Sequence, residues 1–597
     1  MKKQDNLKKL AVVAVILIAL NVFSFFAFKR FDLTQDKRYT LSQTSFSILE
    51  DVKQPLVVDV FLEGEFPGEF RKLQTETRQL LEEFKAYNSN VTFRFINPLD
   101  DSEGSDNDKR DLIYTIFKMD NPIRSKQDKA EIEKSIKEIP DLDKALMDSF
   151  AGSGMMPARV TVNDKGKQSE AVVFPWAIAT YEGRSVKIPL LKNSMAASTA
   201  QKVVGSVQHL EYAFANGFNT ISHAKEKKVA VIKGNGEMPD LLMADFIKNV
   251  RENYFIGTFT LDSVAKQPTQ TLEYLKKYDL AVITKPSETF TDAEKQVLDQ
   301  FVINGGKTLW LVDEVQIEMD SLMTDGQTLA FPRDLNLADM FFKYGFRINP
   351  TLVKDLQAAP IALATGQQGS AAQYTQYPWY YSPLIFPDGN NNPIVSHLDA
   401  IKFEFANGID TLKNGIKKSV LLKSSVYSKT VGTPVEVNLN MVEERPDPSQ
   451  FKNTGNIPVA VLLEGKFHSV FENRVLPFKD KTFATEGKPS KMIVISDGDV
   501  IRNQLDKNYQ PMELGYDKWT NQLYANKEFL SNCVNYLLDD NGLINIRSKE
   551  VNLPVLDPQK VYGAYDRSQF ITVGAPIVLL VVAGAVFTFL RRRRYAK

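Results

Sequence analysis

The chain has 597 residues, of which 43% are hydrophobic and 24% charged, with 73 basic and 73 acidic side chains. That length and composition can bury two or more ordinary cores. Between the two terminal apolar runs described below, acidic residues outnumber basic ones by about ten, which argues against a nucleic-acid partner because such proteins neutralise phosphates with basic patches. The only cysteine, Cys533, excludes an internal disulfide, and a large exported domain without disulfides suits a bacterial envelope better than a eukaryotic cell surface.

An uncharged run near the start, residues 10–28, follows four lysines at positions 2, 3, 8 and 9. A cleaved signal peptide would have a shorter apolar stretch of about 7–15 residues and a small-residue cleavage site. The end of this run, from Ser24 to Phe28, instead carries bulky aromatic residues. We therefore predict an uncleaved transmembrane helix over 10–28, so that residues 1–30 form a cytoplasmic tail and a first span.

A second uncharged run, Ile571–Leu590, is followed at once by Arg591, Arg592, Arg593 and Arg594. About 20 apolar residues in a helix cross the ~30 Å hydrocarbon core of a bilayer. Because basic residues are retained on the cytoplasmic side, the four arginines are a topology signal that places the C-terminus in the cytoplasm; contact with anionic lipid is a secondary role. We assign 570–597 to a second transmembrane helix with a basic tail, and expect the bulk of the chain on the periplasmic side of the bacterial inner membrane.

Residues 31–225 are predicted to form a first extracytoplasmic α/β domain. Ser42 is placed to cap a helix that runs to Leu49. Leu56–Leu62 and Val91–Ile96 have the composition of strands, and an apolar face recurs at helical spacing over Glu69–Tyr87 between them, which makes a β-α-β start. We further expect a loop over 100–111, one or two helices over 126–147, strands over 156–191 with a turn at 163–166, and a long helix over 196–221.

Residues 226–545 are predicted to form a second, Rossmann-like α/β domain, followed by a return linker over 546–569. Short apolar strands alternate here with helices at the spacing of a mainly parallel sheet. The helix over 291–304 begins with the capping-box pair Thr291 and Glu294 and stops at Gly305. We expect strands at 228–233, 255–261, 279–284, 308–312, 401–405, 459–463 and 491–495, helices at 241–253 and 527–538, a helix and a strand within 335–354, and a mobile Gly-, Ala- and Gln-rich segment at 358–372.

Two glycine motifs resemble nucleotide-binding loops but lack required residues. Gly306-Lys307-Thr308 matches the end of a phosphate-binding loop, which also needs a glycine where Phe301 stands and leads from strand to helix, not from helix to strand. Gly234-Asn235-Gly236 follows a strand, but Pro239 stands at the third glycine of the dinucleotide fingerprint. We predict no nucleotide cofactor, and keep the 234–237 turn as a ligand-binding candidate because open α/β sheets bind ligands at this edge.

Metal and catalytic signatures are also missing from the sequence. No zinc-binding pattern connects the four histidines, His209, His223, His397 and His468, and there is no G-x-S-x-G motif. Asp497 and Asp499 follow an apolar strand, but further cation ligands at a defined spacing are missing, so a turn that caps a helix is preferred. Cys533 lies in a helical apolar pattern and is predicted to be a core thiol, not a nucleophile. We predict no enzyme activity, no metal and no cofactor.

The densest aromatic cluster of the chain is interrupted by prolines and contains Tyr374, Tyr377, Trp379, Tyr380, Tyr381 and Phe386. Aromatic residues and prolines in a loop can form a surface that binds a peptide or a sugar. Burial at the edge of the second domain's core is the alternative, and it is preferred. If the cluster is exposed, Tyr377, Trp379, Tyr380 and Tyr381 are the candidate contact surface.

Three stretches, together with the two terminal spans, resemble one family. The stretches are Lys228–Glu237, Phe301–Asp313 and Asp540–Arg547. The family is that of the gliding motility-associated ABC transporter components (GldG) of Bacteroidota, within the wider ABC-type uncharacterized transport system family. The resemblance covers nearly the whole chain and implies a partner permease and a separate cytoplasmic ATPase, together needed for gliding. The family is often described as substrate-binding, but its shared motifs are structural turns and supply no ligand residues.

The residues and the resemblance favour a non-catalytic, membrane-anchored subunit that binds or couples on the periplasmic side of an ABC transporter complex. The alternative is a stand-alone envelope scaffold or a glycan- or peptide-binding module that uses the aromatic residues of 374–387. A third hypothesis, an enzyme with an amidotransferase-like sheet, is disfavoured because no nucleophile is present.

Overall fold

A computed structural model describes residues 12–22, 32, 40–64, 66–100, 105–121, 125–164, 167–192, 195, 198–368, 371–387, 389–444, 446–549 and 564–595. The chain divides into two compact units, Met1–Lys549 and Glu550–Lys597. The larger unit contains two main β-sheets that are covered by helices, and the smaller unit contains the C-terminal apolar helix. The mixed α/β class expected from the sequence is therefore confirmed.

The first sheet of the large unit has the strand order β2-β1-β5-β6. Its strands are β1 (Leu56–Val60), β2 (Val91–Phe95), β5 (Trp176–Tyr181) and β6 (Arg184–Pro189). β1 and β2 pair in parallel through the crossover helix α3 (Gly68–Tyr87), as parallel neighbours require, whereas β5 and β6 join antiparallel. The predicted β-α-β start is confirmed, and so is the buried face of α3, which consists of Phe70, Leu73, Thr77, Leu80, Leu81 and Phe84.

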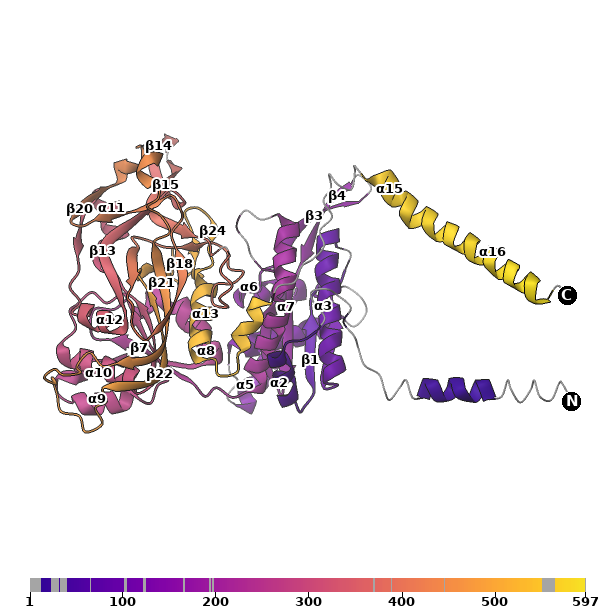
Figure 1. Cartoon of the computed structure of the whole chain (residues 1–597), viewed down its shortest axis with the longest axis horizontal. Helices are drawn as coiled ribbons and strands as arrows, with labels where there is room; N and C mark the ends of the chain where they lie inside the picture. Colours follow the sequence, from indigo (N-terminus) through magenta and orange to yellow (C-terminus); the bar gives the residue numbers. More distant parts are fainter. Residues whose placement is uncertain are drawn as a thin grey trace. The chain divides into compact units, whose positions relative to one another are not determined.

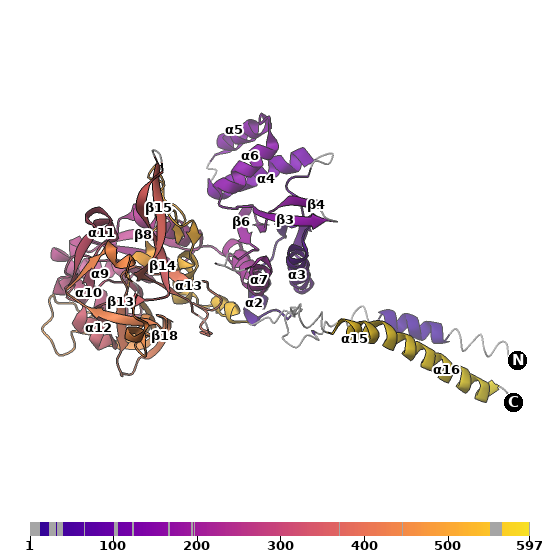
Figure 2. The same ribbon diagram turned by 90° about the horizontal axis from the view of Figure 1, so that it is seen from above.

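Helices cover both faces of this first sheet (Figure 2). One group is α2 (Gln43–Asp51), α3 and α7 (Thr199–Ser222), and the other is α4 (Ser105–Asp120), α5 (Lys126–Lys137) and α6 (Leu142–Gly152). The Ser42 hydroxyl accepts the Ser45 N–H and caps α2, as predicted. A β-hairpin, β3 (Ala158–Asp164) and β4 (Lys167–Val173), precedes β5, and residues 165–166 of its predicted turn lie outside the described residues.

The loop predicted over 100–111 is wrong from Ser105 onward, where α4 begins. The acidic start of this segment has the composition of a loop, but Asp106 and Asp108 lie in the first turn of the helix, where the helix dipole stabilises negative charge. Ile113 and Ile116 further along the helix are buried in one core with the side chains of α6. Residues 101–104 lie outside the described residues.

The second sheet has seven strands in the order β18-β21-β22-β10-β9-β7-β8. They are β7 (Lys228–Lys233), β8 (Phe255–Thr260), β9 (Leu280–Thr284), β10 (Lys307–Leu311), β18 (Lys417–Lys423), β21 (Pro458–His468) and β22 (Glu486–Ile495). The five from β22 to β8 are parallel and follow the doubly wound order 2-1-3-4-5. The predicted parallel sheet is confirmed, and β21 and β18 extend it as antiparallel strands at one edge.

Both faces of the second sheet are covered by helices (Figure 1). Val229 and Val231 of β7 face one core, with α8 (Ala244–Asn253) and α13 (Asn526–Leu538). Ala230 and Ile232 face the other, with α9 (Pro268–Leu275), α10 (Asp292–Ile303) and α12 (Ala338–Tyr344). Burial on both faces explains why these strands appear in the sequence as continuous apolar runs and not as alternating ones.

Between α10 and β22 the chain adds smaller sheets to this core. They contain β11 (Val315–Gln316), β12 (Gln327–Pro332), β13 (Phe346–Asp355), β14 (Ala358–Gln368), β15 (Ala371–Ile385), β16 (Ile401–Lys402), β17 (Asn407–Thr411), β19 (Ser428–Gly432) and β20 (Val435–Asn438). Residues 358–368 and 371–372 of the segment predicted to be mobile lie in β14 and β15, which pair as a long antiparallel hairpin (Figure 1), and residues 369–370 lie outside the described residues. Ala359 is the only buried side chain described in β14, so this strand carries no apolar alternation that would have predicted it.

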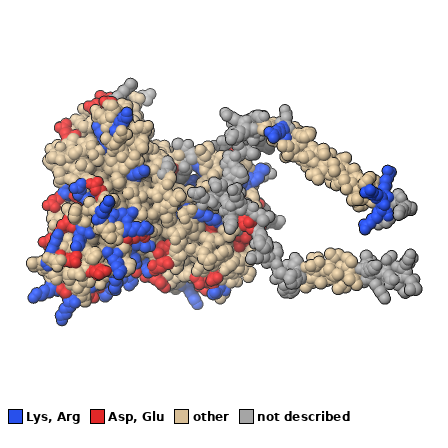
Figure 3. All heavy atoms as spheres, in the orientation of Figure 1, with Lys and Arg blue, Asp and Glu red and all other residues tan. Residues whose placement is uncertain are grey.

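The smaller unit contains an uninterrupted helix over Arg567–Arg594, with 28 residues and a mean hydropathy of 2.5 in its most apolar window. It comprises α15 (Tyr565–Gln569), a short π-helical turn (Phe570–Gly574) and α16 (Ala575–Tyr595). Figure 3 shows uncharged residues along this helix and the basic group at its C-terminal end. In the described part of the chain it is the one helix long and apolar enough to cross a membrane. Near the N-terminus a shorter apolar helix covers Val12–Val22, and the remaining residues of the predicted first span lie outside the described residues.

Candidate functional site at the carboxyl edge of the second sheet

Charged residues follow three neighbouring parallel strands and meet at one edge of the sheet. Lys285 follows β9, Asp313 lies two residues beyond β10, and Asp497 and Asp499 lie just beyond β22. The carboxyl ends of parallel strands share an edge, and ligands of open α/β sheets bind there. The alternating strands and helices form a parallel sheet, and this sheet places the charged residues together at one edge.

Lys285 is the centre of this charge network. Its Nζ lies 2.6 Å from Asp499 Oδ2, 2.8 Å from Glu318 Oε2 and 3.7 Å from Asp313 Oδ2. The side chains of Lys285, Asp313 and Asp499 are 8–9% exposed. A buried ammonium is stable only when carboxylates compensate its lost hydration, so these contacts form one interdependent unit.

The turn after β22 ties its two aspartates to the backbone. Asp497 accepts the N–H groups of Glu404, at 2.5 Å, and of Asp499, at 2.7 Å. The Gly498 N–H donates to Asp313 Oδ1 at 2.6 Å. A Cβ on Gly498 would lie 2.5 Å from the side chain of Lys285, so only glycine allows this close approach.

The preferred prediction for Asp497 and Asp499, a turn that caps a helix, agrees with the structure in part. Asp499 starts a short 3-10 helix, Asp499–Ile501, but the N-cap residue is Gly498 and no side chain caps this helix. Within the described ranges no group of three or more His, Cys, Asp or Glu side chains is placed to hold a metal ion.

Burial changes the protonation of this network. It raises the pKa of Asp313 to about 6, although the Lys285 ammonium acts in the opposite direction. Burial, followed by repulsion from Asp499, raises the pKa of Glu404 to about 7. Burial alone would lower the pKa of Lys285, but the surrounding carboxylates outweigh it and raise that pKa. The network therefore holds a charged lysine beside carboxyl groups that accept protons near neutral pH.

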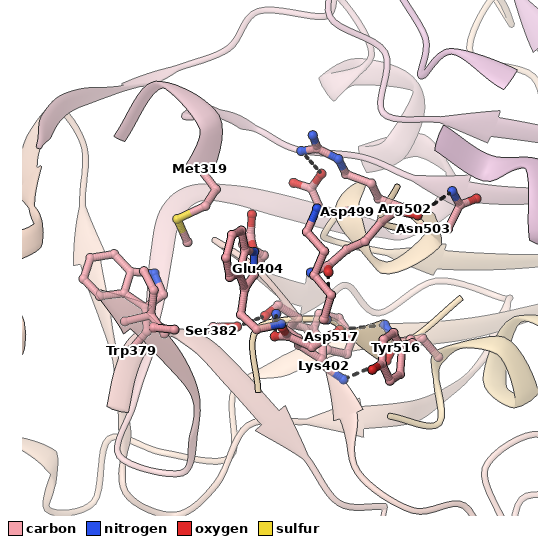
Figure 4. A pocket seen from close by; sticks show the side chains of 18 of the residues that line it. Met319, Trp379, Ser382, Lys402, Glu404, Asp499, Arg502, Asn503, Tyr516 and Asp517 are labelled. Atoms are coloured by element: carbon pink, nitrogen blue, oxygen red, sulfur yellow. Dashed lines mark hydrogen bonds and ion pairs between the residues drawn. The ribbon is translucent and has the colours of Figure 1, made fainter. Parts of the chain in front are cut away.

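A cavity of about 370 Å³ opens beside the network (Figure 4). Figure 4 shows Trp379 and Met319 on one side, Asp499, Arg502 and Asn503 on the other, and Lys402, Tyr516 and Asp517 along a third wall. Further lining residues include Asp320, Glu404, Gln504, Lys518, Trp519 and Asn526. This volume lies within the range of ~300–1,000 Å³ that small-molecule sites occupy.

Most polar groups of the cavity wall already have partners. Lys402 Nζ lies 3.0 Å from Asp517 Oδ2, and Arg502 Nη2 lies 2.6 Å from Asp320 Oδ2. The Asn526 side chain accepts a hydrogen bond from the backbone N–H of Lys402 and donates one to the backbone C=O of Lys402. These contacts fix the positions of the wall and leave few side-chain atoms free to bind a ligand.

The four residues of the predicted contact surface divide between core and partly exposed positions on β15. Trp379 and Tyr381 are 2% and 3% exposed, and their ring centroids lie 5.7 Å apart in a cluster with Phe405. Tyr377 and Tyr380 are half-buried. Trp379 also lines the cavity. A contact role for the four residues stays a prediction.

The structure brings two separate sequence candidates, Trp379 and Asp499, to the wall of one cavity. Sequence reasoning missed Lys402, Glu404 and Arg502. One signal was present: Lys402 and Glu404 stand two positions apart in a predicted strand and so share a face. Lys402 and Glu404 are about 95 residues from Asp499 in the sequence, so their proximity to it could not be predicted, whereas Arg502 follows Asp499 by three residues.

The glycine motifs have packing explanations. A Cβ on Gly306 would lie within 2.4–2.6 Å of the Phe301 ring, so the residue that breaks the phosphate-loop pattern is also the one that requires this glycine. Gly236 has φ +69°, and a Cβ there would collide with the Ser287 hydroxyl.

Cys533 is fully buried, which raises its pKa and agrees with a core thiol.

These features define an α/β protein with a charged cavity at the carboxyl edge of a doubly wound sheet and a C-terminal helix long and apolar enough to cross a membrane. The model of the ABC-type uncharacterized transport system family matches residues 226–533, just over half of the chain, which contains the whole sheet and the cavity. The chain belongs to this family, which associates it with an ABC transporter as an auxiliary component. A second family model, a domain of unknown function (DUF7088), matches residues 35–180.

Two further proteins are similar to the chain. An uncharacterized protein of Borreliella burgdorferi is 22% identical over 403 residues, which cover 67% of this chain and 69% of that protein. The solved N-terminal domain of mmIFT52 is 15% identical, matches over 55% of this chain and 100% of its own, and has a TM-score of 0.29. At that TM-score the likeness supports no conclusion about this chain.

Proposed function

We propose that the chain is a non-catalytic auxiliary subunit of an ABC transporter complex, anchored in the bacterial inner membrane with its large unit on the periplasmic side. The observation that carries this proposal is the family match over 226–533. An ABC transporter needs a phosphate-binding loop to hydrolyse ATP, and this sequence has Phe301 where that loop needs a glycine. A separate ATPase would therefore supply the energy, and this chain would bind or couple outside the cytoplasm.

The apolar helix over 567–594 supports the membrane anchor. Its side chains are exposed along its length, for example Leu579 at 70% and Leu580 at 74%, and a helix apolar on all sides is stable in lipid rather than in water. Arg591–Arg594 at its end favour a cytoplasmic C-terminus. With a first span over 10–28, both termini would be cytoplasmic and the large unit periplasmic.

The partners that follow are a polytopic permease and a cytoplasmic ATPase, and gliding motility is the process that the sequence resemblance implies. Deletion of the gene in a gliding host should abolish colony spreading, and the full-length chain should restore it. Normal spreading by the deletion strain would remove gliding from the proposal without affecting the transporter role.

Co-purification tests the transporter role. The tagged full-length chain is extracted from native membranes in mild detergent, with untagged membranes as background, and the bound proteins are quantified by mass spectrometry. We expect a permease and a phosphate-loop ATPase at a fixed ratio to the chain. Recovery of the chain alone, or with cell-wall fragments only, would contradict the proposal and favour the stand-alone scaffold.

A further inference from the structure

Two buried polar atoms on the cavity wall have no hydrogen-bond partner among the described residues: Trp379 Nε1 and Asp499 Oδ1. The Trp379 side chain is 98% buried (2% exposed), and Figure 4 shows its indole nitrogen on the side of the ring that faces the cavity. Asp499 Oδ1 forms an ion pair with Arg502 Nη1 at 3.8 Å, which is beyond hydrogen-bond distance. A buried polar atom without a partner is costly, so each of these atoms would gain from a hydrogen bond to a group that enters the cavity.

The two atoms require opposite hydrogen-bonding partners. An indole N–H only donates, and an ionised carboxylate oxygen only accepts. A ligand that satisfies both must carry an acceptor and a donor, and a hydroxyl group is both. The chemistry of the inner wall therefore favours a ligand with several hydroxyl groups.

The charges of the wall favour a neutral ligand. Lys402 pairs with Asp517 and Arg502 pairs with Asp320, so two of the lining cations are already neutralised. The Lys518 ammonium lies over the Trp519 ring, 5.4 Å from its centroid, and also donates to the carbonyl of Leu505. Four carboxylates line the cavity against these three cations, which disfavours a phosphate or a carboxylate as the ligand.

The outer wall adds an aromatic platform. Trp519 lines the cavity and is 57% exposed, and its ring centroid lies 5.9 Å from that of Tyr374, which is 55% exposed. Two exposed aromatic rings side by side offer an apolar surface to the C–H face of a ring-shaped ligand. Trp519 lies between β23 (Tyr516–Asp517) and β24 (Gln522–Leu523), and Tyr374 lies on β15.

We propose that this cavity binds a neutral sugar ring, either a free monosaccharide or the terminal residue of an envelope glycan. The hydroxyl groups would bond Trp379 Nε1 and Asp499 Oδ1, and the apolar face of the sugar would rest on Trp519. Access to an envelope glycan rests on the proposed periplasmic location, whereas binding by the purified chain does not. An experiment that contradicts one of the two proposals therefore leaves the other one open to its own test.

The test is titration calorimetry on the purified full-length chain in nanodiscs, which avoids sugar-headed detergents. The probes are glucose, galactose, mannose and N-acetylglucosamine, each free and as its disaccharide, with trialanine as the peptide probe. We expect saturable binding of at least one sugar and none of trialanine. Binding of none of these sugars, or of trialanine at the same cavity, overturns the proposal.

Three variants locate the binding. Trp379→Phe removes the N–H donor together with part of the indole ring system, and Trp519→Ala removes the exposed platform. Each should weaken binding about tenfold, the scale of one lost hydrogen bond or stacking contact. Tyr427→Ala is the matched control, because Tyr427 is 60% exposed and does not line the cavity. Thermal unfolding confirms that each variant is folded, and Trp519→Ala, at an exposed position, keeps the test valid if Trp379→Phe is unstable. Sugar binding that both cavity variants leave unchanged also overturns the proposal.

Discussion

The buried side chain of Lys285 limits which substitutions the neighbouring residues can tolerate. Its side chain passes over Gly498, where a Cβ would lie 2.5 Å from it. The ammonium in turn compensates Asp499 and Asp313. The charge network and the backbone of the 497–499 turn are therefore coupled, and a change in either should be felt by both.

Gly498→Ala tests this coupling. The added methyl group must displace Lys285 or the turn, and overpacking of this kind costs about 1–3 kcal/mol. We expect a lower thermal unfolding midpoint than in the wild type. Gly432→Ala is the control, because no atom lies within 4 Å of a Cβ at that position. Equal midpoints for the two variants would show that Lys285 is not confined as described.

The pH dependence of stability tests the raised pKa values. Carboxyl groups in the unfolded chain titrate near about pH 4, whereas burial raises the pKa of Glu404 to about 7 and that of Asp313 to about 6. The stability that these two carboxyl groups contribute is therefore fully present below their pKa in the unfolded chain. It is lost as the pH rises through their pKa in the folded protein. In the wild type the thermal unfolding midpoint should fall between about pH 5 and about pH 8, and in Glu404→Gln this fall should be smaller. Glu436→Gln, which removes an exposed carboxylate, should change it little. A wild-type slope in Glu404→Gln would contradict the assigned environment.

The elements that could be predicted are those whose signals are local. β7 is a continuous apolar run, and α10 begins with Thr291 and Glu294, which form the predicted capping box. The β14–β15 hairpin could not be predicted, because its glycines and glutamines carry no apolar period and its pairing depends on the chain around it.

The cavity was only partly predictable for a related reason. Asp499 at the end of its strand and Trp379 in its aromatic cluster are candidates from the sequence, although the sequence favours a structural role for each. Arg502 follows Asp499 by three residues and pairs with it locally, whereas Glu404 and Trp379 reach this site only through tertiary contacts, which no local pattern in the sequence reports.

The capping box of α10 provides a test at the level of one element. Thr291→Ala removes the hydroxyl that accepts the Glu294 N–H and should cost about 1 kcal/mol. Thr291→Ser keeps the hydroxyl and should retain most of the stability. Denaturant midpoints compare the two variants, and an alanine variant as stable as the serine variant would show that the cap does not contribute.

In the whole molecule, two compact units have opposite surface chemistry. Figure 3 shows charged side chains over the large unit and uncharged ones along the helix of 567–594. Apart from the short apolar helix Val12–Val22 of the large unit, only the second surface suits lipid. The sequence predicted this helix from hydropathy and charge alone, and the described residues contain it. The side of the membrane on which the large unit lies decides whether its cavity can meet an envelope ligand.

A cysteine-labelling experiment determines that side. Cys533 is fully buried with a raised pKa, so the native chain offers little background to a thiol reagent. Single cysteines are introduced as Lys481→Cys, at an exposed position of the large unit, and as Lys597→Cys at the C-terminus. Cells permeabilised only at the outer membrane are treated with a maleimide that cannot cross the inner membrane. We expect labelling of Lys481→Cys in these cells and of Lys597→Cys only after lysis. The reverse pattern would place the large unit in the cytoplasm and contradict the proposed periplasmic role.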